Sequence, residues 1–449
     1  MVSRDYPLCP RTARRRSGIV VLGRLRSLEY GPVLSDIAPN QEFGSSHWRV
    51  PAVVIGGELN GLGVCRSLAL GGMPVWVVDR KRLNPALWSR YADSVLTDAL
   101  HGHSFVVFLR DLRRRIGERP FLVITDERAL LTVSEYRKEL EGLYHFRLPT
   151  HDTVIMLHDK ARFHESAGEH GWPVPNGVVV RDLPGIREIT SLRLPMILKP
   201  ADKRHFHEGH APRLITAESY ADALSAAERL LAQTGEVLVQ ETIEGPDDNI
   251  YFCLFYRGRN GETLGMFTGQ KLASTPPGTG STAFCTAAVN EELERTTKNL
   301  LDQVNYFGFG GVEYKRDTRS GRFLIIEPTV GRTDWQEESA TLVGVNIPLI
   351  AYRHELNLQP LPAGPVDGRV VWQSSWIERI RFGAKPIPPR SVVVDGYWRR
   401  DDPLPAMVHY PCDMARALAF YLPPWLAGPR RTAGKAHRSR WFSSKLSSS

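Results

Sequence analysis

The stretch at residues 310–332, GGVEYKRDTRSGRFLIIEPTVGR, constrains the fold of this chain more than any other. Residues 312–315 alternate apolar and polar side chains, residues 317–321 have turn chemistry, and residues 323–327 form a second apolar run that ends in a carboxylate. Two strand patterns joined by a short polar turn are typical of a β-hairpin. The sequence therefore predicts two antiparallel strands paired across a tight turn.

Two glutamates occupy matching positions on the arms of this hairpin. A turn centred on Ser320 places Glu313 directly opposite Glu327, because their numbers sum to twice that of the centre. Opposed residues share a face, with Cβ atoms roughly 5 Å apart, and two like charges repel there unless a positive charge lies between them. Mg²⁺ is commonly held by one or two carboxylates together with substrate phosphates, so a divalent cation is the natural occupant. On this pair alone, two strand-end glutamates that point into water remain an alternative.

The composition is that of a globular chain with basic ends. Of 449 residues, 42% are hydrophobic and 24% are charged, which allows ordinary cores in about two to four domains. The net charge of +8 is uneven, because arginines and lysines crowd residues 4–26 and 430–445. Such ends could bind nucleic acid or acidic lipid, but we predict solvated, disordered tails and no nucleic-acid partner, because the aromatic interleaving of a nucleic-acid surface is absent. No apolar run approaches 18 residues, so no membrane span is expected.

The cysteines and the first residues bear on the compartment. Five cysteines stand at positions 9, 65, 253, 285 and 412, with neither a CxxC pair nor zinc spacing. An odd number without a pattern indicates reduced thiols and therefore a cytoplasmic protein. Residues 18–22 are too short for the apolar region of a signal peptide, and no small-residue cleavage site follows them.

Residues 51–150 have the pattern of a small parallel α/β domain, which follows a basic tail at residues 1–50. A buried-strand pattern at residues 51–55 leads through a glycine-rich turn, residues 56–63, into a helix, and the next strand ends at Asp79. This order is about the length of a mononucleotide-binding unit, and its glycines let the backbone approach a ligand. One alternative is therefore a dinucleotide site with Asp79 on a ribose. The run GGELNGLG is not GxGxxG, however, and it does not decide the question.

The rest of the chain has another organisation. Residues 151–357 alternate helices with antiparallel strands, which indicates an α+β arrangement in two parts, 151–236 and 237–357. Proline and glycine then mark a break before a small C-terminal extension at 358–427. Residues 428–449 are predicted to be a second basic, disordered tail.

Charged residues recur in order between residues 160 and 332. Lysines stand where predicted elements begin or end, two strand-end glutamates follow, and an arginine comes last: Lys160, Lys199, Lys271, Glu313, Glu327 and Arg332. Lysines are compact charges suited to phosphate oxygens, and a metal that bridges those oxygens completes the neutralisation. Gln240 could pair with an adenine edge, and the main chain of Glu241 and Ile243 with the ring. Asp247 could bind the ribose hydroxyls.

This order resembles the ATP-grasp superfamily of carboxylate–amine ligases. The segments that carry the resemblance are DK at 159–160, ILKP at 197–200, VLVQETIEGPD at 237–247, QK at 270–271, GVEYK at 311–315 and FLIIEPTVGR at 323–332. The resemblance covers about residues 151–357, and residues 51–150 look like the small domain that precedes this fold. It implies a chain of α/β and α+β class, in which a small parallel α/β pre-ATP-grasp domain precedes a two-subdomain ATP-grasp fold and a small C-terminal extension.

The resemblance also implies a role for each residue of the site. Lys160, Lys199 and Lys271 would bind phosphates, Gln240 and the main chain of Glu241 and Ile243 would bind adenine, and Asp247 would bind ribose. The magnesium ligands would be Glu313, Glu327 and Thr329, and the catalytic residues would be Arg332 and Lys271. The implied reaction activates a small-molecule carboxylate as an acyl phosphate and joins it to an amine, with ATP and Mg²⁺ as cofactors and amino-acid-like substrates. Such an enzyme could assemble as a homodimer.

Some features depart from the family pattern or refine it. The family usually has Asn where Thr329 stands, and Thr is a poorer metal ligand. The loop at 201–212 is basic rather than glycine-rich. Its HxHExH run could be a metal cluster, but no rigid element holds those ligands, and we interpret the loop as a mobile lid. The runs GGELNGLGVCRSL at 56–68 and DPLP at 402–405 look most like a D-aspartate-ligase-like branch. In the ATP-grasp architecture the small domain usually helps to bind the non-nucleotide substrate, so Asn60 would face that substrate.

An ATP- and Mg²⁺-dependent ligase is therefore the leading hypothesis. A non-catalytic or regulatory ATP-binding protein is the second, motivated by Thr329 and the glycine-poor loop. A nicotinamide-dependent oxidoreductase is the third, and it leaves the order of lysines and carboxylates between residues 160 and 332 unexplained.

Overall fold

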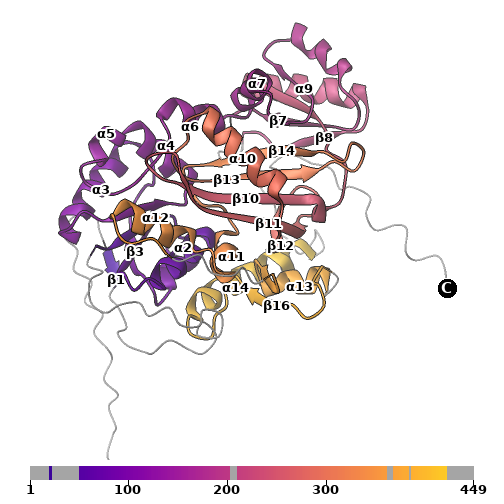
Figure 1. The fold of residues 1–449 in the computed structure, drawn as a ribbon. Helices are drawn as coiled ribbons and strands as arrows, with labels where there is room; N and C mark the ends of the chain where they lie inside the picture. Colours follow the sequence, from indigo (N-terminus) through magenta and orange to yellow (C-terminus); the bar gives the residue numbers. More distant parts are fainter. Residues whose placement is uncertain (1–19, 23–49, 203–209, 362–367, 384–385, 422–449) are drawn as a thin grey trace, which may run out of the picture.

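The computed structural model of the chain describes residues 20–22, 50–202, 210–361, 368–383 and 386–421. The predicted tail at 428–449, nearly all of the predicted tail at 1–50, and His205 and His207 of the HxHExH run lie outside these residues. The described part is built on three β-sheets with helices around them (Figure 1). No helix within it is long and apolar enough to cross a membrane.

The first sheet is the predicted parallel α/β unit with one added edge strand. Its order is β1-β4-β3-β2-β5, and the parallel strands are β2 (Ala52–Ile55), β3 (Val75–Asp79), β4 (Asp93–Leu96) and β5 (Phe121–Ile124). These strands are apolar and largely buried, because helices cover parallel sheets on both faces. β1 (Val20–Leu22) pairs antiparallel with β4, so the prediction that all of residues 1–50 are a disordered tail is corrected at these three residues.

Helices connect the strands of this sheet. The glycine-rich turn after β2 leads into α2 (Leu59–Ala69), which is buried along its whole length. A short 3-10 turn, η1 (Pro85–Trp88), lies between β3 and β4, and α3 (Gly102–Ile116) leads to β5. After β5 come α4 (Glu127–Glu135), α5 (Arg137–Leu140) and α6 (His151–His158). β5 pairs with the edge of β2 that faces away from β3, so the order of the strands changes direction at β2. Such a change in a parallel sheet commonly marks a ligand crevice.

A four-stranded antiparallel sheet forms the second unit, with the order β6-β9-β7-β8. Its strands are β6 (Gly177–Val180), β7 (Met196–Pro200), β8 (Ile215–Ala217) and β9 (Val237–Glu241). Its helices are α7 (Lys160–His170), the 3-10 segment η2 (Pro184–Ser191) and α9 (Tyr220–Thr234). Leu198, Leu230 and Val239 lie in a hydrophobic core that is made only of residues of this unit.

The third sheet has seven strands in the order β14-β13-β10-β11-β12-β15-β16. They are β10 (Ile250–Arg257), β11 (Thr263–Thr275), β12 (Ser281–Ala287), β13 (Gly308–Arg316), β14 (Phe323–Val330), β15 (Val370–Gln373) and β16 (Val392–Asp395). Only β15 and β16 run parallel to each other. The helices of this part are η3 (Asp247–Asn249), α10 (Glu291–Gln303), α11 (Glu337–Leu342), α12 (Ile347–Glu355), α13 (Trp376–Phe382) and α14 (Leu404–Tyr421).

The first sheet and the seven-stranded sheet share their hydrophobic cores. One core joins Ile55 of β2 to Phe255 of β10 and Val330 of β14, and a second joins Leu62 of α2 to Trp372 of β15. Figure 1 shows the first sheet and α12 gathered at one end of the long strands, with the four-stranded unit above their other side. The four-stranded unit, which has its own core, is therefore the part that can form a second wall facing the large sheet.

Three strands bear on the predicted domain ranges, which otherwise stay predictions. β9 belongs to the four-stranded sheet, so a boundary at residues 236–237 would cut that sheet. β15 and β16 lie within the predicted extension at 358–427, yet they continue the seven-stranded sheet through β12. The extension is thus part of the large sheet rather than an appendage.

Candidate active site

A cleft of about 420 Å³ lies between the four-stranded and the seven-stranded sheet. Ile197 and Lys199 of β7 line one side, and Glu313 of β13 and Glu327 of β14 line the other. Its volume falls within the range of roughly 300–1,000 Å³ that small-molecule sites occupy.

Nine of the eleven predicted site residues line this cleft: Lys160, Lys199, Gln240, Ile243, Lys271, Glu313, Glu327, Thr329 and Arg332. They come from both walls and from segments up to 172 positions apart, so only the folded chain brings them together. Lys160 is placed by its neighbour, because the Asp159 carboxylate caps α7 by accepting a hydrogen bond from the Arg162 N–H at 2.9 Å.

The predicted hairpin is confirmed, and so is the opposed pair of glutamates. β13 pairs with β14 in a register that sets Glu313 opposite Glu327. The turn is not centred on Ser320, however, because Arg316 pairs with Phe323. A shift between Glu313 and Tyr314 restores the pairing, since Tyr314 faces Ile325 and one residue of β14 is left over. A β-bulge therefore brings the two carboxylates level, as bulges near active sites often re-aim side chains.

A lysine supplies the positive charge next to the two carboxylates. The Lys271 Nζ lies 2.6 Å from the Glu313 Oε2, and Lys271 is only 3% exposed. Burial raises the pKa of Glu313, the Lys271 ammonium lowers it, and the charges of Asp334 and Glu327 raise it. The pair thus has a cation close by even in the bare protein.

The donor set suits Mg²⁺ in combination with phosphate. Among the described residues there is no group of three or more His, Cys, Asp or Glu side chains that could hold a metal ion. Mg²⁺ needs no such cage, because one or two carboxylates together with phosphate oxygens and water complete its octahedron. Glu313 and Glu327 offer those two carboxylates, and Thr329 adds a neutral oxygen to the cleft.

Known proteins resemble this chain in sequence and in fold. No family model matches the chain. The D-aspartate ligase of Enterococcus faecium (strain Aus0004) is 25% identical over 332 residues, which span 69% of this chain and 75% of that protein. The biotin carboxylase domain of Hydrogenobacter thermophilus 2-oxoglutarate carboxylase, solved with MgADP, ADP and bicarbonate, superposes with a TM-score of 0.56 over 72% of this chain and 73% of its own, at 14% identity.

The ADP complex of purK, an N5-carboxyaminoimidazole ribonucleotide synthetase, gives a TM-score of 0.54 over 71% of this chain and 79% of its own, at 16% identity. This chain has the ATP-grasp fold. The predicted fold class is confirmed, and the prediction of an ATP- and Mg²⁺-dependent ligase agrees with these relatives.

Two predicted residues of the ATP-grasp site do not line the cleft. The Glu241 carboxylate accepts hydrogen bonds from the Arg193 main chain and guanidinium. The main-chain N–H of Glu241 donates to the Asn176 carbonyl at 2.9 Å. The Asp247 carboxylate accepts 2.9 Å hydrogen bonds from the main-chain N–H groups of Ser274 and Gly278. Asp247 thus fastens the end of β11 and the loop that follows it, and its role as a ribose ligand stays a prediction.

Several residues of the cleft were not predicted. Those with polar side chains or glycines include Glu127, Asp202, Arg213, the segment 278–282, Lys315, Asp334, Trp335 and Gln336. Strand alternation could have identified Lys315, because it follows Glu313 by two positions and shares its face. Burial lowers the pKa of Lys315, whereas Asp247 and Asp317 raise it. A half-buried ammonium thus adds to the positive charge of the cleft.

The helix that follows the glycine-rich turn of the first sheet contacts the segment next to Arg332. The Asn60 side chain donates to the Thr333 carbonyl at 2.8 Å and accepts from the Thr333 hydroxyl at 2.6 Å. Asn60 is buried and does not line the cleft, and it holds the segment next to Arg332. The Asp79 carboxylate accepts three hydrogen bonds, from the Gly57 and Lys81 main chain and the Asn84 amide, which leaves it engaged within its own domain.

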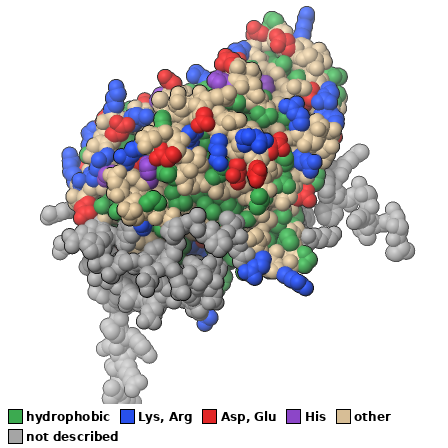
Figure 2. Space-filling view, in the orientation of Figure 1, with side chains coloured by type: hydrophobic (Ala, Val, Ile, Leu, Met, Phe, Trp, Pro, Cys, Tyr) green, Lys and Arg blue, Asp and Glu red, His purple; other side chains and the backbone are tan. Residues whose placement is uncertain are grey.

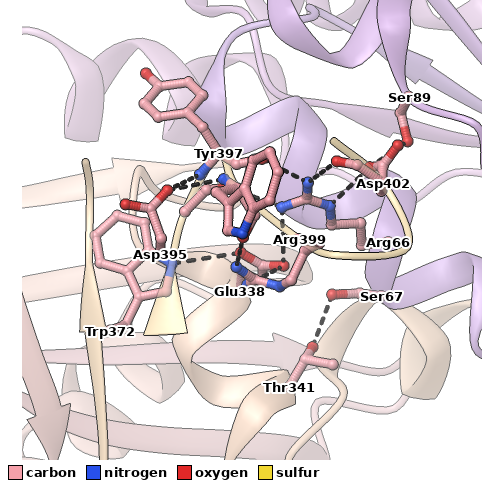
Figure 3. A network of polar contacts seen from close by, with 12 residues as sticks. Arg66, Ser67, Ser89, Glu338, Thr341, Trp372, Asp395, Tyr397, Arg399 and Asp402 are labelled. Carbon is pink, nitrogen blue, oxygen red and sulfur yellow. Dashed lines mark hydrogen bonds and ion pairs between the residues drawn. The ribbon is translucent and has the colours of Figure 1, made fainter. Parts of the chain in front are cut away.

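Figure 3 shows that the two runs that suggested the D-aspartate-ligase-like branch meet in one buried network. The Arg66 Nε of the first run lies 3.0 Å from the Asp402 Oδ2 of the second. Arg66 and Arg399 both pair with the Glu338 Oε1, at 3.5 and 2.8 Å. Glu338 lies in the first turn of α11, and α11 begins directly after the cleft residues 334–336, so the network fixes the helix that follows the cleft.

Proposed function

We propose that this chain is an ATP- and Mg²⁺-dependent ligase that joins a carboxylate, through an acyl phosphate, to an amine. The observation that carries the proposal is the cleft that gathers Glu313 opposite Glu327 with four lysines and Arg332. We further propose an amino acid or a similar molecule as the carboxylate, with D-aspartate as the first candidate, because the ligase of that name matches over 75% of its own length.

The cleft offers the nucleotide an apolar end and a charged end. Ile197, Ile243, Ile250 and Ile326 line it together with Gln240, a combination that suits a flat purine. Lys160 and Lys199 would hold the phosphates, and Glu313, Glu327 and Thr329 would hold Mg²⁺. When bound, the metal would neutralise the charge that develops on the phosphoryl oxygens.

The proposed chemistry proceeds in two steps. A carboxylate oxygen of the substrate attacks the γ-phosphorus, the bond to the β-γ bridging oxygen breaks, and ADP leaves. The amine nitrogen then attacks the acyl carbon. The bond between the acyl carbon and the phosphate oxygen breaks, inorganic phosphate leaves, and the nitrogen loses a proton. Lys271 and Arg332 would position the reacting groups and stabilise their negative charge, because both line the same cleft.

A non-catalytic ATP-binding protein is the second candidate. It is favoured by Thr329 in place of the usual Asn and by the Lys271–Glu313 ion pair, which occupies one of the two metal carboxylates. The nicotinamide-dependent oxidoreductase has less support, because the Asp79 carboxylate is already held by three hydrogen bonds.

Release of ADP separates these candidates. The full chain would be incubated with ATP and a panel of amino and carboxylic acids, D-aspartate included, with a panel of amines, and with or without Mg²⁺. We expect ADP and phosphate in equal amounts, only with Mg²⁺ and only with one class of acid. Mg-ATP binding without ADP release under every combination would favour the non-catalytic protein, and NADH binding in place of ATP would overturn the proposal.

Compartment and assembly complete the proposal. Cys65, Cys253 and Cys285 are buried free thiols in the described part of the chain, as in a protein of the reducing cytoplasm. The biotin carboxylase domain that shares this fold is described as a dimer, and we propose a homodimer here as well. Sedimentation velocity at micromolar concentration would test the assembly.

A further inference from the structure

The hydrogen bonds around Gln240 fix the direction of its side-chain amide. The Lys199 Nζ lies 3.3 Å from the Gln240 Oε1, and the Gln240 Nε2 lies 3.3 Å from the Nδ1 of His164. A lysine ammonium can only donate hydrogen bonds, so the amide oxygen must be the atom that faces Lys199. The amide nitrogen then faces His164, whose Nδ1 must accept.

The surroundings hold this chain of hydrogen bonds in place. Gln240 is 5% exposed and lies on β9 between Gly177 of β6 and Ile197 of β7. A Cβ atom at Gly177 would come within 2.9 Å of the Gln240 Cγ and 3.0 Å of the His164 Cε1. The glycine therefore makes the space in which the Gln240 side chain and the imidazole meet. Burial lowers the pKa of His164, which favours the neutral ring that can accept.

The oriented amide presents its oxygen, a hydrogen-bond acceptor, to the ligand. Gln240 and Lys199 both line the cleft, whereas His164 is not among its lining residues. The amide oxygen has two acceptor sites, and a hydrogen bond from Lys199 occupies one of them. The second can accept from a 6-amino purine, whereas a 6-oxo purine would bring a second oxygen against it.

We propose that His164 is a specificity-determining residue, which locks the Gln240 amide so that the cleft selects 6-amino over 6-oxo purine nucleotides. His164 acts through Gln240 and is a positioning residue. The inference rests on the proposed function, because it assumes that the base of a nucleoside triphosphate lies beside Gln240.

The test compares ATP with ITP in the full-length protein. Binding of Mg-ATP and Mg-ITP would be measured by calorimetry for the wild type, His164→Phe and His164→Gln. Phenylalanine keeps a flat ring but cannot accept. When Lys199 binds the nucleotide phosphates, as proposed above, neither neighbour then holds the amide, and Gln240 can turn its nitrogen toward the base. Glutamine keeps an acceptor and a donor at this position. Any contribution from the other atoms of the base is common to all three proteins and cancels in the ratio of the two affinities.

We expect the wild type to prefer ATP by at least about tenfold, as one mismatched buried hydrogen-bonding group commonly costs. His164→Phe should lower this preference by about tenfold and gain affinity for ITP, which simple loss of structure would not do. His164→Gln should retain most of the preference. Each ratio is measured within one preparation, so a lower folded fraction does not affect it.

Two results would overturn this inference while leaving the proposed function intact. One is equal affinity of the wild type for ATP and ITP, which needs no variant and therefore holds even if a variant fails to fold. The other is an unchanged preference in His164→Phe. If the folded wild type binds neither nucleotide, the proposed function fails and the inference fails with it.

Discussion

The two walls of the cleft are built in different ways. The wall formed by the seven-stranded sheet shares its hydrophobic cores with the first sheet, and the Arg66–Glu338–Arg399–Asp402 network ties it to the C-terminal strands. The wall formed by the four-stranded sheet has a core made of its own residues. The first wall carries Glu313, Glu327 and Lys271, and the second carries Lys199 and Gln240.

This difference indicates a division of labour between the walls. Groups that must meet a reacting phosphorus or carbon atom need positions fixed to within about half an ångström, and the shared cores of the large sheet can hold them. Groups that hold the base and the phosphates lie on a sheet that packs in a core of its own, although Phe163 and Ala167 of α7 belong to the core of the large sheet. The predictions below test where the chemistry and the stability reside, from the largest expected effect to the smallest.

Loss of one carboxylate from the wall formed by the seven-stranded sheet should have the largest effect. Glu327→Gln keeps the size of the side chain and removes a ligand of the bridging metal, so turnover should fall by about a hundredfold or more. The melting temperature of the bare protein should stay the same or rise slightly, because a like-charge contact with Glu313 is removed. ADP release and thermal melts would be measured on the same preparation.

The matched control is Glu228→Gln, on the exposed side of α9 in the other wall. It should leave both quantities unchanged. Near-normal turnover in Glu327→Gln would remove this residue from the metal site, and a large drop in its melting temperature would make the carboxylate structural.

Removal of the buried cation should destabilise the same wall. Lys271→Met leaves Glu313 without its 2.6 Å partner, and breaking a buried ion pair commonly costs about 3–5 kcal/mol. Urea unfolding of the bare protein would measure the loss. The double variant Lys271→Met/Glu313→Gln should recover most of it, because the uncompensated charge is gone. Equal instability of the single and double variants would show that Lys271 stabilises through packing alone.

The pH dependence of stability should reveal a second buried carboxyl behind this wall. Burial and the neighbouring Glu338 raise the pKa of Glu337 from 4.5 to about 8, while hydrogen bonds from Ser67 and Thr341 lower it. The folded state therefore keeps a proton that the unfolded state has lost. The stability that this proton confers is complete below about pH 4.5 and is lost as the pH rises toward about 8.

Glu337→Gln should remove this dependence, because the amide does not titrate. We expect the variant to be about 1–3 kcal/mol more stable than the wild type at pH 8 and to show little difference at pH 5. Unfolding by urea at both values would test this. A variant that is equally destabilised at both would show that the amide fails to fit the Ser67 and Thr341 hydroxyls.

A smaller effect should follow from changing Lys315, the cleft lysine that was not predicted. Lys315 faces the cleft, and no carboxylate forms an ion pair with it among the described residues. Lys315→Met keeps most of the apolar stem and should weaken Mg-ATP binding by about three- to tenfold. Lys298→Met on α10, outside the cleft, is the control and should bind normally. Unchanged ATP affinity in Lys315→Met would place the ammonium outside the nucleotide site.

Much of the wall formed by the seven-stranded sheet could be predicted from local patterns. The alternation on both sides of residues 317–321 predicted the hairpin and the opposed pair Glu313 and Glu327. The pair was predicted from an incorrect turn centre, because a bulge has no clear signature in these side chains. The position of Asp247 could not be predicted either, since its partners, Ser274 on β11 and Gly278 on the following loop, are brought near only by folding.

The supports of the site were the least predictable part. Arg66 and Asp402 are separated by 336 positions, and each alone has the pattern of a surface charge. The same holds for His164, whose contact with Gln240 depends on how α7 packs on β9. Spacing along the chain predicts residues that share an element, whereas these contacts depend on tertiary packing.

The central claim is that Glu313 and Glu327 bind a divalent cation together with the nucleotide. Mn²⁺ in place of Mg²⁺ can be followed by its paramagnetic resonance signal, which is lost when the ion binds. We predict that the wild type binds Mn²⁺ tightly only when ADP is present, and that Glu327→Gln loses this coupled binding while it still binds ADP without metal. Equal Mn²⁺ affinity of the two proteins in the presence of ADP would contradict the account.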